Sequence, residues 1–168
     1  MILIHTALLC EAQSFIEYYK LKIVNSSIYI NDDIVILISG IGKQNTISSM
    51  HDVFLNYSIT KAFNIGIAGC NDTKIKIGSL YCTNQVLREI PSLPLLSKDA
   101  VTIDSLVQIS TLYDMEAKYF HEISLEHLNP DNIFIFKIVS DYLSCEILPK
   151  DYIKSLISQQ KIIHHFIK

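Results

Sequence analysis

Four acidic residues stand where the sequence changes from an apolar run to a polar or helix-like stretch. Glu11 follows the apolar start of the chain, Asp114 and Glu116 precede a helix-like run, and Asp141 follows a second apolar run. Two carboxyl groups in one cleft can divide acid–base work, since one takes a proton from water and the other protonates a leaving group. Each acid also has an ordinary interpretation, as a first-turn residue favoured by the helix dipole or as an N-cap. The residues alone leave both interpretations open.

The glycines are few, and they cluster at the ends of apolar runs. All 5 lie between Gly40 and Gly78; Gly40 and Gly42 follow the run IVILI, and Gly66 and Gly69 follow AFNI. Ligands of open parallel sheets bind outside the carboxyl ends of strands, and glycine allows backbone to approach a ligand closely. This placement favours two ligand-binding turns, with plain turn chemistry as the alternative.

The turn SGIGK (39–43) is neither a phosphate loop nor a dinucleotide fingerprint. A phosphate loop needs glycine where Leu37 stands and serine or threonine where Gln44 stands, and the dinucleotide fingerprint needs glycine in place of Asn45. A tight strand-to-helix turn remains. Its amides and the Ser39 hydroxyl are placed to contact an oxygen of a sugar or a water.

Strand-like and helix-like segments alternate along the chain. The short, continuous apolar runs typical of strands covered on both faces are 1–7, 27–30, 34–38, 62–67, 79–86 and 133–139. Helix-like segments are 11–21, 43–57, 116–128 and the tail 149–168, whereas 88–99 is loop-like, with two prolines. The alternation predicts one α/β domain over 1–168, with a central mixed, mostly parallel twisted sheet flanked by helices.

Composition excludes several classes of protein. The 168 residues carry a net charge of −3 with no basic run, which disfavours a nucleic-acid or anionic-membrane partner. No apolar run is long enough for a transmembrane helix, and the N-terminus is interpreted as a first strand rather than a signal peptide. Four scattered cysteines without CxxC spacing are typical of free thiols in the cytoplasm. The histidines have no clustered Cys or Asp partners, so no metal site is predicted.

Six segments together resemble the purine nucleoside phosphorylase and nucleosidase superfamily, most closely methylthioadenosine/S-adenosylhomocysteine nucleosidases. Their order and rough spacing follow that family over most of the chain. They are ALLCEAQ (7–13), SGIGK (39–43), NIGIAG (64–69), IKIGSLY (75–81), YDMEA (113–117) and VSD (139–141).

The resemblance implies a role for each acid. Glu11 matches the residue that activates the attacking water, and Asp141 matches the acid that protonates the departing purine, a state that burial of its carboxyl favours. Glu116 matches the carboxylate that binds the ribose hydroxyls and is expected to stay ionised, and Met115 packs on the sugar. Asp114 is interpreted as capping or solvating the helix start.

The resemblance also implies further substrate contacts. Those of the sugar and nucleophile region are Ser39, Ile41, Gly42, Gly66, Lys137 and Ser140, and those near the base are Leu106 and Val107.

Two replacements bear on the nucleophile. Phosphorylases of the superfamily hold phosphate with arginines, one of which is replaced here by Asn64, and Arg88 is the one arginine of the chain. Water is therefore the favoured nucleophile, and the prediction is a nucleosidase for a purine nucleoside or thionucleoside. Lys137 stands where the nucleosidases carry an arginine, four residues before Asp141; it retains the charge but not the bidentate geometry, which is expected to weaken the positioning of the water. The alternatives are a phosphorylase and a catalytically degenerate nucleoside-binding protein. The resemblance further implies a homodimer and no metal or organic cofactor.

Overall fold

A mixed sheet forms the centre of the molecule, which we describe from a computed structural model covering residues 1–98, 108–144 and 146–168. The strands are β1 (Ile2–Thr6), β2 (Lys22–Ile23), β3 (Ile28–Ile30), β4 (Ile34–Ile38), β5 (Lys61–Cys70), β6 (Leu80–Cys82), β7 (Leu95–Ser97), β8 (Leu112–Asp114) and β9 (Ile133–Asp141). The helices are α1 (Leu9–Tyr19), α2 (Lys43–Asn56), α3 (Ala117–Leu125), α4 (Lys150–Ser158) and α5 (Ile163–Ile167), with a 3-10 turn at Pro130–Asn132.

The strand order β2-β3-β4-β1-β5-β8-β7, with β9 beside β5 and β6 beside β9, places the parallel strands at the centre. Strand β1 runs parallel to both β4 and β5, and β5 runs parallel to β9. The outer pairs β2–β3, β3–β4, β5–β8 and β6–β9 are antiparallel. The carboxyl ends of β1, β4, β5 and β9 therefore meet at one edge of the sheet.

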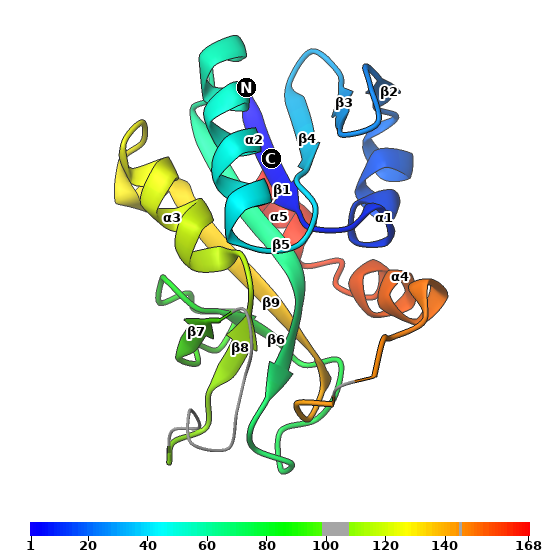
Figure 1. Cartoon of the computed structure of the whole chain (residues 1–168), viewed down its shortest axis with the longest axis vertical. Helices are drawn as coiled ribbons and strands as arrows, with labels where there is room; N and C mark the ends of the chain where they lie inside the picture. The colour runs from blue at the N-terminus through cyan, green and yellow to red at the C-terminus, as the bar shows by residue number, and fades with distance from the viewer. Residues whose placement is uncertain (99–107, 145) are drawn as a thin grey trace.

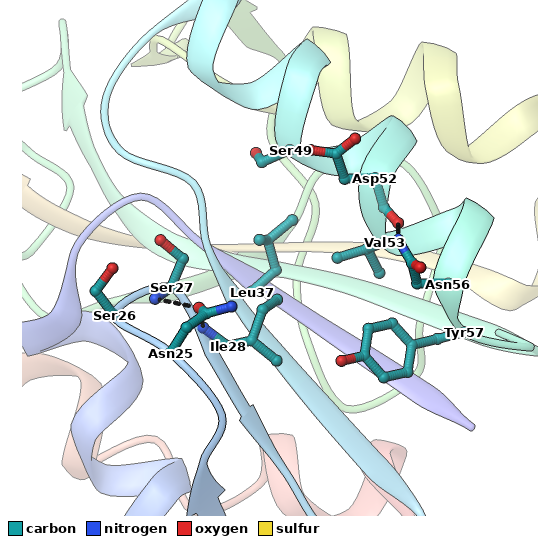
Figure 2. A pocket seen from close by; sticks show the side chains of 10 residues that line it. All are labelled: Asn25, Ser26, Ser27, Ile28, Leu37, Ser49, Asp52, Val53, Asn56 and Tyr57. Atoms are coloured by element: carbon teal, nitrogen blue, oxygen red, sulfur yellow. Dashed lines mark hydrogen bonds between the residues drawn. The ribbon is translucent and has the colours of Figure 1, made fainter.

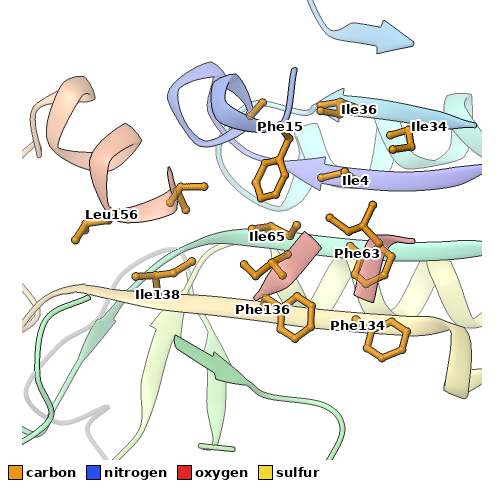
Figure 3. Close-up of a cluster of buried hydrophobic side chains, with 14 of the residues drawn as sticks. Ile4, Phe15, Ile34, Ile36, Phe63, Ile65, Phe134, Phe136, Ile138 and Leu156 are labelled. Atoms are coloured by element: carbon orange, nitrogen blue, oxygen red, sulfur yellow. The ribbon is translucent and has the colours of Figure 1, made fainter. Parts of the chain in front are cut away.

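Both faces of the central strands are covered by helices. Alternate residues of one strand enter different cores: Phe134 and Phe136 pack on one side of β9, and Ile135 packs on the other. Helices α1, α4 and α5 cover the first face, where Phe15 of α1 belongs to the same buried cluster as Phe134 and Phe136 and lies near Ile65 (Figure 3). Helices α2 and α3 lie side by side on the opposite face (Figure 1). Coverage of both faces explains why the strand sequences are continuously apolar rather than alternating.

The mixed, mostly parallel α/β sheet predicted from the sequence is confirmed, with local differences. The tail forms two helices rather than one, because the chain leaves the helical path after Ser158 and resumes it at Ile163. The strand expected at 79–86 is shorter, since only Leu80–Cys82 pairs with β9. Part of the expected loop, Leu95–Ser97, pairs with β8. Among the described helices, none has the length and apolarity that crossing a bilayer requires.

Candidate functional site

A cavity of about 200 Å³ lies at the edge where the central strands end. The first turn of α1, the turn after β4, the end of β5, the segment from β8 into α3 and the end of β9 all contribute to its lining. Six residues predicted to act on the substrate line it, namely Glu11, Ile41, Met115, Glu116, Ser140 and Asp141. The fold thus brings together side chains that are far apart in the sequence, as expected of a site at the carboxyl ends of parallel strands.

The Glu11 carboxylate is buried and held by three backbone amides. The N–H groups of Ala7 and Leu8 donate to its Oε2 at 3.0 and 2.9 Å, and the N–H of Ile67 donates to its Oε1 at 3.0 Å. The bond to Leu8 satisfies the N-cap amide of α1, so the ordinary helix-start interpretation also holds. Burial raises the pKa of Glu11, although the charge of Lys137 and the three amides oppose the rise.

Gly66 makes room for this carboxylate. A Cβ atom at Gly66 would lie 2.8 Å from Glu11 Oε1 and 3.5 Å from Lys137 Nζ. In the sheet, Gly66 of β5 is paired with Lys137 of β9. The missing side chain therefore lets a carboxylate and an ammonium group approach each other above the same strand.

Lys137 is bound to Asp114 in the protein interior, which corrects the interpretation of Asp114 as a solvated residue. The Lys137 Nζ to Asp114 Oδ2 distance is 2.8 Å, and both side chains are 2% exposed. The expected capping role is present, since the N–H of Ala117 donates to Asp114 Oδ2 at 2.9 Å. Burial alone would lower the pKa of Lys137, but the charges of Asp114, Glu116 and Glu11 outweigh it and raise that pKa.

Glu116 is buried at the start of α3 and reaches across to the turn after β4. Its Oε1 accepts a hydrogen bond from the N–H of Gly42 at 2.7 Å. Burial raises the pKa of Glu116 to about 7, although the charge of Lys137 and the Gly42 amide oppose the rise. Lys137 is already bound to Asp114, so burial of Glu116 opposes its ionised state, and the ionised Glu116 expected when ribose hydroxyls bind it stays a prediction.

Asp141 lies at the end of β9 and is only partly buried. Its Oδ2 accepts a hydrogen bond from the Ser140 hydroxyl at 2.6 Å, and its Oδ1 accepts one from the N–H of Ser144 at 2.9 Å. The Ser140 backbone is fixed in turn, since the Tyr152 hydroxyl donates to its carbonyl at 3.1 Å. These contacts hold the carboxyl group at the cavity wall.

A buried hydrogen-bonded chain connects β5, β1 and the turn after β4. Asn64 Nδ2 donates to His5 Nδ1 at 2.7 Å, which leaves His5 Nε2 to donate to Ser39 Oγ at 2.9 Å. The Ser39 hydroxyl donates to the carbonyl of Gly40 at 2.7 Å. Burial, aided by the charge of Lys137, lowers the pKa of His5 to about 3, so the ring is neutral. These hydrogen bonds hold the turn that contains Gly40 in place against β1 and β5.

Four of the predicted contact residues lie beside the cavity rather than on its wall. Ser39 is committed to the buried chain, Gly42 binds Glu116, Gly66 gives space to Glu11, and Lys137 binds Asp114. In this structure these four residues position the turn after β4, Glu116, Glu11 and Asp114.

Two further predicted contacts, Leu106 and Val107, lie outside the described residues. Sequence reasoning missed His5 and the partnership of Asp114 with Lys137. The one signal for Asp114 was its position two residues before Glu116.

A larger cavity, of about 740 Å³, lies between α2 and the strands β3 and β4 (Figure 2). Ile28, Leu37 and Val53 supply apolar surface there, and the other described lining residues are mostly hydroxyl and amide side chains. Asp52 is the one carboxylate among them, and it is exposed. Because acid–base catalysis needs positioned titratable groups, the smaller cavity is the better candidate for an active site.

Comparison with known proteins supports the assignment of the fold. No protein-family model and no curated protein sequence matches the chain. Among solved structures, a 5′-methylthioadenosine/S-adenosyl homocysteine nucleosidase of Campylobacter jejuni is 13% identical, with a TM-score of 0.79 over 99% of this chain and 97% of that one. The corresponding nucleosidase of Chlamydia trachomatis is 16% identical, with a TM-score of 0.76 over 98% and 94% of the two chains. A futalosine hydrolase of Helicobacter pylori is 14% identical, with a TM-score of 0.76 over 99% and 96%. The chain therefore has the fold of these nucleosidases.

Proposed function

We propose that the protein is a nucleosidase that hydrolyses the N-glycosidic bond of a purine nucleoside or thionucleoside. The observation that carries this proposal is the convergence of Glu11, Glu116 and Asp141 on one cavity from three different parts of the sheet edge. Structures of the Chlamydia trachomatis nucleosidase bound to MTA and bound to adenine support the choice of substrate class. With methylthioadenosine as substrate, the reaction would belong to methionine salvage.

Glu11 is the proposed base that activates water. A carboxylate has about four lone-pair positions, and three backbone amides occupy three of those on Glu11. One position is left to accept a proton from a water in the cavity. The three amides fix the orientation of the carboxylate, and its raised pKa makes it a stronger base at neutral pH.

Glu116 and Met115 are the proposed sugar-binding residues. Glu116 Oε1 is held by the Gly42 amide, which leaves Oε2 to accept hydrogen bonds from the ribose hydroxyls. Cleavage then gives the sugar ring the character of an oxocarbenium ion. The carboxylates of Glu11 and Glu116 stabilise this developing positive charge from within the same cavity.

Asp141 is the proposed acid that protonates the departing purine. Its carboxyl group is only partly buried at the cavity wall, so a purine bound in the cavity would lie against it and take its proton as the N-glycosidic bond breaks. Leu106 and Val107 stay proposed contacts of the base.

The charges around the cavity favour water over phosphate as the nucleophile. Glu11, Asp114, Glu116 and Asp141 all line the cavity, and the nearby Lys137 is engaged by Asp114 at 2.8 Å. A phosphate dianion would meet several carboxylates and no free cation among the described lining residues. Arg88 is exposed and is not part of the described lining.

The test is an assay for free base, by chromatography, with methylthioadenosine, S-adenosylhomocysteine, adenosine and inosine, each with and without phosphate. We expect phosphate-independent release of base and losses of about 10²- to 10⁴-fold in rate for Glu11→Gln and for Asp141→Asn. Glu17→Gln is the matched control, because Glu17 lies on α1 with Glu11 but is exposed and pairs with Lys154. A strict phosphate requirement would identify a phosphorylase. Ligand-induced thermal stabilisation without turnover would identify a degenerate binding protein.

We also propose that the protein is a cytoplasmic homodimer. The described cysteines Cys10, Cys70 and Cys82 are free thiols, in keeping with a reducing compartment. Ile41 at the cavity and Leu55 on α2 are large apolar side chains left 51% and 82% exposed in the single chain. Light scattering coupled to size-exclusion chromatography would measure the mass, and a monomer at all concentrations would contradict the dimer.

A further inference from the structure

Three metal-ligating side chains meet on the surface away from the cavity. His51 lies on α2, and Glu126 and His127 directly follow α3. One ligand atom of each residue lies within 4.8 Å of the ligand atoms of the other two. All three side chains are exposed, so their ligand atoms are open to an ion from solvent.

The surrounding packing restricts where these side chains can be. Buried residues of both helices, Val53 from α2 and Ile123 from α3, join the same core. The ring of His127 stacks on Phe54 with 4.3 Å between ring centroids and 14° between planes. The N–H of His127 donates to the carbonyl of Ser124 at 3.1 Å, which fixes the backbone at the end of α3.

From this geometry we propose that His51, Glu126 and His127 form a binding site for a divalent transition-metal ion, with Zn²⁺ as the preferred occupant. Two imidazole nitrogens and one carboxylate oxygen suit Zn²⁺, whereas Mg²⁺ and Ca²⁺ prefer oxygen ligands. Three protein ligands leave a fourth position for water. Cu²⁺ and Ni²⁺ are expected to bind as well, because imidazole also suits these ions.

The side chains need only a small movement to close around the ion. Ligand atoms of a tetrahedral zinc site are about 3.3 Å apart, from Zn–N distances of about 2.0–2.1 Å. The present separations reach up to 4.8 Å, and rotation of exposed side chains can close such a gap. A bound ion would connect α2 and α3 at a second place. The starts of the two helices are already connected, because the N–H of Gly42 at the start of α2 donates to Glu116 at the start of α3.

The test is isothermal titration calorimetry of the full, tag-free chain with ZnCl₂ in a non-chelating buffer. We expect one ion per chain and an affinity lowered by at least about tenfold in His51→Ala, since one of three ligands is lost. Excess Zn²⁺ is expected to raise the Tm by on the order of 5 to 10 °C at 100 times the dissociation constant. The Co²⁺ form should show the visible absorption of a tetrahedral ion.

His51→Ala is chosen because His51 is exposed on a helix, where alanine is well tolerated. Glu126→Gln is the second variant, and its affinity should fall without loss of the Phe54–His127 stacking. His165→Ala is the matched control, since His165 is an exposed histidine of α5 far from the site in sequence. Absence of stoichiometric binding, or equal affinity in wild type and His51→Ala, would overturn the proposal. The readout is metal binding, so it is independent of the nucleosidase proposal.

Discussion

Substitution of Gly66 by alanine tests the central geometric feature of the cavity. The new Cβ would lie 2.8 Å from Glu11 Oε1, closer than real Cβ contacts. A free glutamate side chain would move aside easily, but this carboxylate is held by the amides of Ala7, Leu8 and Ile67. The oxygen that must retreat is the one bound to Ile67, so the substitution is expected to weaken or break that bond.

The magnitude follows from two opposing effects. A hydrogen bond to a charged group contributes about 1.5–3 kcal/mol, and its loss destabilises the fold. Replacing Gly66 by alanine within a strand gains about 0.5–1 kcal/mol from the lower entropy of the unfolded chain. We expect a net loss of about 1–2 kcal/mol, which for a chain of 168 residues corresponds to a Tm lower by about 2–8 °C. Displacement of Glu11 should also slow hydrolysis by about 10- to 100-fold.

The assay is a double-mutant cycle measured by urea denaturation of wild type, Gly66→Ala, Glu11→Ala and the double variant. Without the Glu11 carboxylate the added methyl group has no oxygen to contact, so Gly66→Ala in the Glu11→Ala background should be neutral or stabilising. The expected coupling free energy is at least about 1.5 kcal/mol. Equal effects of Gly66→Ala in both backgrounds would refute the reasoning, as would a stabilised, fully active Gly66→Ala protein.

Three further substitutions test the charges and hydrogen bonds beneath the cavity. The folded-state pKa of Glu116, about 7, exceeds its ordinary value of 4.5, so its contribution to stability is lost as pH rises from about 4.5 through about 7. Glu116→Gln should remove that loss and be more stable than wild type above pH 7 by on the order of a few kcal/mol, with urea curves converging near pH 4.5. Lys137→Met should lower the free energy of unfolding by about 3–5 kcal/mol, because it leaves Asp114 buried without its cation. Adding Asp114→Asn to this variant should recover part of the lost stability, and no recovery would contradict the pairing. His5→Leu should lower the free energy of unfolding by about 2–4 kcal/mol, because it removes two buried hydrogen bonds. A Tm equal to that of wild type would argue against the buried chain of hydrogen bonds.

The sheet and most helices could be predicted because their signals are local. Continuous apolar runs such as 34–38 and 133–139 indicate strands buried on both faces, and these became β4 and β9. The interruption of the tail between Ser158 and Ile163 was not visible, because apolar residues continue on both sides of it. The acids Glu11, Glu116 and Asp141 were found because each lies in a short motif at a strand end.

Contacts between distant segments could not be predicted in the same way. The Lys137–Asp114 pair depends on the register that places Lys137 opposite Gly66, and on the burial of both charges. Local sequence shows neither property. The cluster of His51, Glu126 and His127 likewise depends on how α2 packs on α3. Spacing along the chain had argued against any metal site.

The buried acids of the site differ in the donors that compensate their charge. Asp114 has the lysine at 2.8 Å, Glu11 has three amides, and Glu116 has the single amide of Gly42. Burial raises the pKa of both glutamates, that of Glu116 to about 7. On the proposed function, ribose hydroxyls would supply the missing donors, and donors to a carboxylate favour its ionised form. Binding of the sugar and loss of the Glu116 proton would then be coupled, so that the carboxylate gains its full charge as a substrate that develops positive charge arrives.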